Sequence, residues 1–255
     1  MAKLSNVFSN KRKKADSHDK SSFMGRMSSR KPNRKSHENE LTGNLFVKCI
    51  DDTILDINNN HDIIVSRATT SDAIKNLNKD KSIYFNGIDN NVNVTNSRYL
   101  DLGIDDFTID WWEYKLAIPK PNPDEINSTQ FSFYKNSTDR KQPIAIKNTD
   151  HKSIYLSSDG DHWDIADDKY MGTIVENKWT HWVIARSNNN FYTFKNGQLK
   201  NIWISDKPIN SSDGFLTLGS GPTGNNFYGY IVNFRLVKSQ TLWVEEFDLK
   251  KDLYY

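Results

Sequence analysis

The chain has 255 residues, of which 36% are hydrophobic and 12% aromatic, enough for one large folded domain with an apolar core. Its single cysteine, Cys49, excludes an intramolecular disulfide and is expected in the core. No run approaches the ~20 apolar residues of a membrane-spanning helix, and the N-terminus lacks the apolar stretch of a signal peptide, so we expect synthesis in the cytoplasm.

Charge is unevenly distributed along the chain. Residues 1–40 hold 11 lysine and arginine residues against 4 acidic ones, a net charge of +7, while the remainder holds 23 against 28, a net charge of −5. The first 40 residues are also too polar to bury much surface, which predicts a disordered basic tail. Its cluster Lys11, Arg12, Lys13 and Lys14 is either a solvated charge run or a salt-sensitive contact with nucleic acid or another polyanion.

Residues 41–255 read as one all-β domain. Short apolar runs recur every 8–12 residues with turn residues between them, the spacing of a β-sandwich. A weak helical pattern covers only residues 71–80. The expected strands lie within residues 44–50, 52–57, 61–66, 81–87, 91–95, 105–118, 130–135, 143–148, 153–158, 163–166, 170–175, 179–186, 190–195, 198–205, 214–220 and 227–238.

The run "WTHWVIAR" is apolar on both faces. Trp179, His181 and Val183 alternate with Trp182 and Ile184, so this strand is either covered on both sides or lines a groove. Farther along, Asn196-Gly197 separates two apolar runs and favours a type I′ hairpin, whose two central residues need positive φ. We interpret the hairpin, Trp179 and His181 as scaffold.

Six motifs in order resemble the laminin-G-like members of the concanavalin A-like lectin/glucanase superfamily, and the version found in phage tail and virion proteins most. They are "SIYFNGIDNNVNV", "DDFTIDWWEY", "YLSSDGDHWDIA", "KWTHWVIARSNNNFYTFKNGQL", "LTLGSG" and "FYGYIVNFRLVKSQTLWVEEFDL". The resemblance covers roughly residues 44–249. It implies a jelly-roll sandwich of two antiparallel sheets with about 12–14 strands, one sheet concave, in a virion or another large assembly.

Glycoside hydrolysis requires paired carboxylates, which the strands do not offer. Retaining enzymes hold two carboxyl groups about 5–5.5 Å apart, and the glucanases of the resembled superfamily place them at alternate positions of one strand. Asp110 and Glu113 have an odd spacing, which puts them on opposite faces. Glu245, Glu246 and Asp248 lie in the terminal segment, where the family carries no chemistry. We therefore expect no enzyme.

Two acidic turns are candidates for calcium, because hard cations prefer clustered oxygen ligands. They contribute Asp89 and Asn90 in one turn and Asp159 and Asp161 in the other. Asp and Asn also cap turns without any metal, which is the alternative for both segments.

A carbohydrate-binding face is the remaining candidate, because aromatic rings stack on sugars. Core packing is the alternative for each ring, since a sandwich needs large inward residues. Exposed groove aromatics would favour recognition of a glycan or protein surface, and a sealed face beside an apolar patch would favour a structural assembly protein anchored by its tail. The candidate rings are Trp112, Trp163, Trp182 and Trp203.

Overall fold

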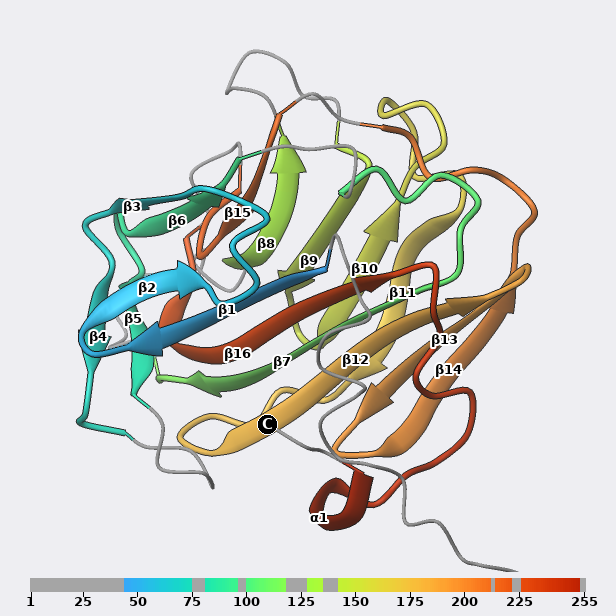
Figure 1. Cartoon of the computed structure of the whole chain (residues 1–255). Helices are drawn as coiled ribbons and strands as arrows, with labels where there is room; N and C mark the ends of the chain where they lie inside the picture. Colours follow the sequence, from blue (N-terminus) through green and yellow to red (C-terminus); the bar gives the residue numbers. More distant parts are fainter. Residues whose placement is uncertain are drawn as a thin grey trace, which may run out of the picture.

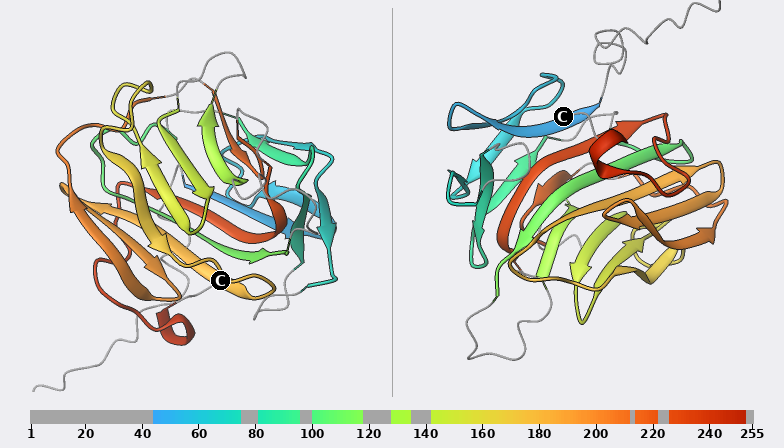
Figure 2. Two further views of the ribbon diagram at one scale, coloured as in Figure 1. Left: turned by 180° about the vertical axis from the view of Figure 1, so that it is seen from behind. Right: turned by 90° about the horizontal axis from the view of Figure 1, so that it is seen from below.

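The chain folds into a sandwich of two antiparallel β-sheets, as the strand pattern predicts. The computed structural model describes residues 44–74, 81–95, 100–117, 128–134, 142–211, 214–221 and 226–252. These residues form sixteen strands and one short helix, α1 (Leu249–Asp252). The two sheets lie face to face in Figures 1 and 2.

The first sheet has nine strands. Along its main path the order is β14-β13-β12-β7-β16-β1-β2, and β5 pairs with β16 and β4 with β5. Their bounds are β1 (Leu45–Ile50), β2 (Thr53–Asp56), β4 (Thr69–Ser71), β5 (Ser82–Asn86), β7 (Phe107–Lys115), β12 (Trp179–Ser187), β13 (Asn190–Lys195), β14 (Gln198–Ile204) and β16 (Tyr228–Lys238).

The second sheet has seven strands in the order β11-β10-β9-β8-β15-β6-β3. Their bounds are β3 (Ile63–Ser66), β6 (Asn91–Val94), β8 (Ser128–Tyr134), β9 (Ile144–Asn148), β10 (Lys152–Leu156), β11 (Ala166–Gly172) and β15 (Phe215–Leu218).

The main core lies between the sheets, because alternate side chains of each strand point inward. On β7 these are Phe107, Ile109 and Trp111, all fully buried. Trp111 packs edge-on against Phe131 of the opposite sheet, with ring centroids 5.1 Å apart. Cys49 is buried as expected.

Some predicted elements differ from the structure. Residues 163–166 are not a strand of their own, since only Ala166 belongs to β11. The three-residue strand β4 carries Thr and Ser but no apolar run, so the apolar pattern missed it. The sixteen described strands exceed the 12–14 that the resemblance implies. The basic tail, the boundary at residue 40 and residues 75–80 of the weak helical pattern lie outside the described residues. The helix that is described is too short to cross a membrane.

The outer face of the nine-stranded sheet is partly covered by residues 239–248, here called the C-terminal strap (Figure 1). Trp243 and Phe247 of the strap stack with centroids 4.4 Å apart, and they pack with Phe194 and Val183 in a second, smaller apolar cluster. The Leu242 amide donates to Thr108 Oγ1 at 2.9 Å. Beyond Trp179, which is half-buried, strand β12 is therefore covered on both faces, one of the two alternatives that its sequence allowed.

The Asn196-Gly197 hairpin has the predicted turn geometry. Both residues have positive φ, 51° and 77°, as a type I′ turn requires. Asn196 Oδ1 accepts a hydrogen bond of 2.9 Å from the His181 amide. The Gly197 carbonyl accepts a bond of 3.0 Å from the Phe247 amide. The turn thus holds the strap against β12.

Gly197→Ala should destabilise the protein more than Gly103→Ala does. Both glycines have positive φ, so both substitutions strain the backbone, by about 1–2 kcal/mol. A Cβ on Gly197 would also lie 2.1 Å from the Phe247 carbonyl oxygen, whereas one on Gly103 meets nothing within 4 Å. Urea unfolding of both variants measures the difference. Equal losses in the free energy of unfolding would show that the strap moves away from the new Cβ without destabilising the protein.

Candidate ligand-binding surface

A row of aromatic side chains crosses the outer face of the nine-stranded sheet. Tyr84 on β5 is directly opposite Tyr230 on β16, and Tyr230 is opposite Tyr114 on β7. Tyr114 is in turn opposite Trp179 on β12. Four neighbouring strands therefore contribute one ring each, which we call the aromatic row.

The aromatic row faces away from the core because its neighbours along each strand face inward. Ile83 and Phe85 flank Tyr84, and Ile231 follows Tyr230; all three are buried in the main core. Strands are ~4.8 Å apart, so a row of four spans ~14 Å. That is long enough to contact more than one sugar unit.

The rings support one another. Centroids are 5.1 Å apart for Tyr84 and Tyr230, 6.1 Å for Tyr230 and Tyr114, and 5.5 Å for Tyr114 and Trp179. Tyr230 is 9% exposed, and the other three are half-buried. Partial burial raises the pKa of Tyr84 and of Tyr230. The surface is a partly exposed apolar strip with hydroxyl groups.

The next row along the same face is buried. Trp112 is opposite His181, with ring centroids 5.1 Å apart, and the strap residues Trp243 and Phe247 pack edge-on against His181. Trp112 is only 6% exposed. The strap therefore bounds the open part of the face on one side.

A buried ion cluster stabilises this boundary. Asp110 Oδ1 accepts a 2.8 Å bond from Arg235 Nε, and Asp110 Oδ2 lies 3.0 Å from His181 Nε2. Burial alone would raise the pKa of Asp110, but Arg235 and His181 outweigh it and lower that pKa to about 2. Burial lowers the pKa of His181. The cluster fixes the side chains of His181 and Arg235 beneath the strap.

Of the four predicted tryptophans, two lie in the main core. Trp182 is 1% exposed, and Trp203 is 9% exposed and stacks on Phe191 with centroids 5.2 Å apart. Both have almost no surface to offer a ligand. Trp112 packs against His181 on the outer face and is 6% exposed. Trp163 alone of the four is half-buried, in the loop between β10 and β11.

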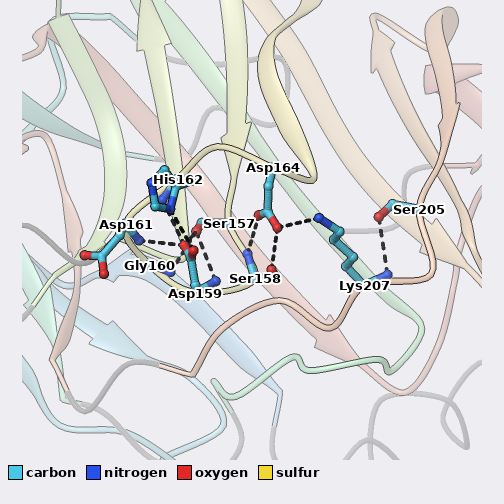
Figure 3. A network of polar contacts seen from close by, with 9 residues as sticks. All are labelled: Ser157, Ser158, Asp159, Gly160, Asp161, His162, Asp164, Ser205 and Lys207. Atoms are coloured by element: carbon cyan, nitrogen blue, oxygen red, sulfur yellow. Dashed lines mark hydrogen bonds and ion pairs between the residues drawn. The ribbon is translucent and has the colours of Figure 1, made fainter.

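One of the two acidic turns uses much of its carboxylate capacity within the turn itself (Figure 3). Asp159 Oδ1 accepts from the amides of Asp161 and His162, both at 2.8 Å, and Oδ2 lies 2.8 Å from His162 Nδ1. These contacts, His162 first, lower the pKa of Asp159.

The other turn behaves in the same way. Asp89 accepts a 2.8 Å bond from Asn86 Nδ2 and pairs with Arg67, while Asn90 is buried. Within the described ranges, no group of three or more His, Cys, Asp or Glu side chains has the placement of a metal site. Calcium binding stays a prediction.

The predicted separation of carboxylates is confirmed. Asp110 points to the outer face, and Glu113 points between the sheets, where Lys152 Nζ donates to it at 2.6 Å. Glu245, Glu246 and Asp248 are exposed on the strap.

The tyrosines of the aromatic row are not among the predicted site residues. The predicted rings are all tryptophans, and three of these four are 9% exposed or less. A signal was present, because Tyr84 stands between two apolar residues in "SIYFNG", and such a position points away from the core.

Comparison with known proteins identifies the fold. No protein-family model and no curated protein matches the sequence. Among solved structures, the binding domain of Paraclostridial Mosquitocidal Protein 1 superposes with a TM-score of 0.61 at 15% identity, over 81% of this chain and 50% of that one. The receptor-binding domain of botulinum neurotoxin type G gives 0.56 at 15% identity, over 81% and 49%.

Domain 4 of AbnA, an arabinanase from Geobacillus stearothermophilus solved with arabinotriose, gives a TM-score of 0.50 at 13% identity, over 72% of this chain and 85% of that one. The chain spans about half the length of the mosquitocidal-protein and neurotoxin binding domains. At these identities the similarity shows the β-sandwich fold alone.

Proposed function

We propose that this protein is a non-enzymatic carbohydrate-recognition domain and that its ligand lies along the aromatic row. The observation that carries the proposal is the direct cross-strand register of Tyr84, Tyr230 and Tyr114. Such a strip suits an extended oligosaccharide, whose apolar ring faces contact the aromatic rings and whose hydroxyl groups bond with the phenols.

The solved structures with this fold support a binding role. One botulinum neurotoxin DC binding domain was solved in complex with SialylT, another in complex with rat synaptotagmin II, and the AbnA domain with arabinotriose. Three domains with this fold have therefore been solved with a bound glycan or protein. The laminin-G-like resemblance agrees with that role, and a place in a virion, the polyanion-binding tail and calcium stay predictions.

A structural role in an assembly is the second candidate. Ile202 and Ile204 on β14 are 50% and 75% exposed. This strand is the last of its sheet among the described residues, so its outer edge has no described partner strand. Exposed apolar side chains on a sheet edge favour contact with another protein.

Tyr114→Ala should weaken glycan binding by about 2- to 12-fold, because each aromatic contact contributes about 0.5–1.5 kcal/mol. Tyr114→Phe keeps the ring and should keep most of the binding. A glycan array of the wild-type chain and both variants makes the measurement. Phe215→Ala, which removes a 37% exposed ring from the other sheet, is the control. Unchanged binding by Tyr114→Ala would reject the aromatic row as the site.

A further inference from the structure

A second exposed aromatic pair lies on the opposite face of the sandwich. Tyr155 belongs to β10, where Ile154 and Leu156 point into the core, so its ring is on the outer face of the seven-stranded sheet. Trp163 packs edge-on against Tyr155, with ring centroids 5.4 Å apart. Both rings are half-buried.

Polar groups flank this pair. Lys147 Nζ lies 4.4 Å from the Tyr155 centroid and 5.4 Å from that of Trp163. Among the described residues, none forms an ion pair with Lys147, and burial lowers the pKa of its ammonium group. The Tyr155 hydroxyl donates to Asp168 Oδ1 at 2.8 Å. A donor and an acceptor therefore stand beside the rings.

The loop that carries Trp163 is fixed on both sides of the ring (Figure 3). Before it, Asp159 closes the turn with His162, as described above. After it, the Asp164 carboxylate accepts a 2.8 Å hydrogen bond from the Ser158 amide and another of 2.8 Å from Lys207 Nζ. Burial opposes ionisation of Asp164, but Lys207 and Ser158 outweigh it and lower its pKa to about 2. The ring is held in place before any ligand arrives, which reduces the entropy cost of binding.

The charge of the surroundings selects the ligand. Near the rings and in the loop, five carboxylates outnumber Lys147, Lys207 and the imidazole of His162, which pairs with Asp159, so an anionic ligand would be repelled. Neutral sugars carry hydroxyl donors for such carboxylates and apolar ring faces for Trp163. The acidic residues are Asp159, Asp161, Asp164, Asp167 and Asp168.

We propose that Trp163 and Tyr155, flanked by Lys147 and Asp168, form a second binding site for a neutral sugar ring, which makes the domain bivalent. The inference rests on the proposed carbohydrate recognition and extends it. Because the two sites lie on the outer faces of different sheets, one ligand molecule cannot cover both, and a single domain can link two glycan chains.

The test uses the full chain on an array of neutral and sialylated glycans, together with precipitation of a polymer that displays the neutral glycans bound on the array. Trp163→Ala should reduce signals from neutral glycans by about tenfold or more, and Trp163→Phe should keep most of them. Lys147→Met removes the flanking donor without removing a ring and should also weaken them. Phe215→Ala, an exposed ring of the same sheet, is the control. Thermal unfolding verifies that each variant is folded.

The outcomes separate the two proposals. Loss of one set of signals in Trp163→Ala and of another in Tyr114→Ala, with precipitation by the wild type alone, supports both sites. Signals lost in Tyr114→Ala but unchanged in Trp163→Ala and Lys147→Met overturn the second site and leave the aromatic row. The reverse pattern supports the Trp163 site and overturns the row. A wild-type chain that binds none of the neutral glycans overturns the second site, and one that binds no glycan at all overturns both.

Discussion

Replacing Lys152 with methionine should lower the free energy of unfolding by about 3–5 kcal/mol, the cost of leaving a buried charge without its partner. The Lys152 side chain is 0% exposed and that of Glu113 is 3% exposed, and the two atoms of the pair are 2.6 Å apart. Lys152 also donates to Asn148 Oδ1 at 2.9 Å. Burial lowers the pKa of Lys152 to about 8, so it keeps its proton at pH 7.

Urea unfolding of a double-mutant cycle measures the effect. The double variant Lys152→Met with Glu113→Leu removes both charges and should recover much of the loss, because apolar side chains can replace a buried pair at little cost. Lys115→Met is the matched control on the same strand as Glu113. Its partner Glu176 is 47% exposed, and we expect a loss of about 1 kcal/mol or less. A double variant as unstable as the single one would contradict this account.

The sequence predicts the strands well because local rules determine them. Alternation and turn residues located nearly every strand, and Asn196-Gly197 identified its turn type. The pairing of β16 with β7 and with both β1 and β5 joins residues far apart in the chain, and no local pattern specifies it. The strand spacing already favours a sandwich, and the resemblance, which rests on the order of six motifs, implies its two antiparallel sheets.

The candidate site was harder to predict, because period-two alternation separates two faces without saying which one is buried. In β12 both faces are apolar, and only the pairing shows that Trp182 points into the main core while His181 lies under the strap. The pattern of "TLWVEEFDL" shows no strong periodicity, so it did not indicate that the strap covers the sheet. Trp163 is one of the predicted tryptophans, but Tyr155 and Lys147 become its neighbours only through the fold.

Asp110→Asn should lower the free energy of unfolding by about 3 kcal/mol at pH 7, because it leaves the charge of Arg235 without its carboxylate under the strap. The Asp110 side chain is 0% exposed and that of Arg235 is 19% exposed, so solvent relieves part of the loss. Glu245→Gln, an exposed carboxylate on the strap, is the control and should change stability by less than about 0.5 kcal/mol.

The same cluster should make the protein acid-sensitive in a defined window. The folded pKa of Asp110, about 2, lies below its ordinary value of 3.8, so the carboxylate stabilises the fold above pH 3.8 and loses that contribution as pH falls toward 2. The contribution is about 2 kcal/mol. The His181 pKa is lowered from 6.5, so its unfolded form binds more protons just below pH 6.5, and stability starts to fall there.

Urea unfolding at a series of pH values tests this assignment. Between pH 4 and pH 2 the wild type should lose about 2 kcal/mol more than Asp110→Asn does, because the variant has no carboxylate to protonate at this position. Parallel pH curves for the two proteins would show that other carboxylates carry the acid response. A steeper loss in the wild type would assign the response to the Asp110 cluster beneath the strap, next to the aromatic row.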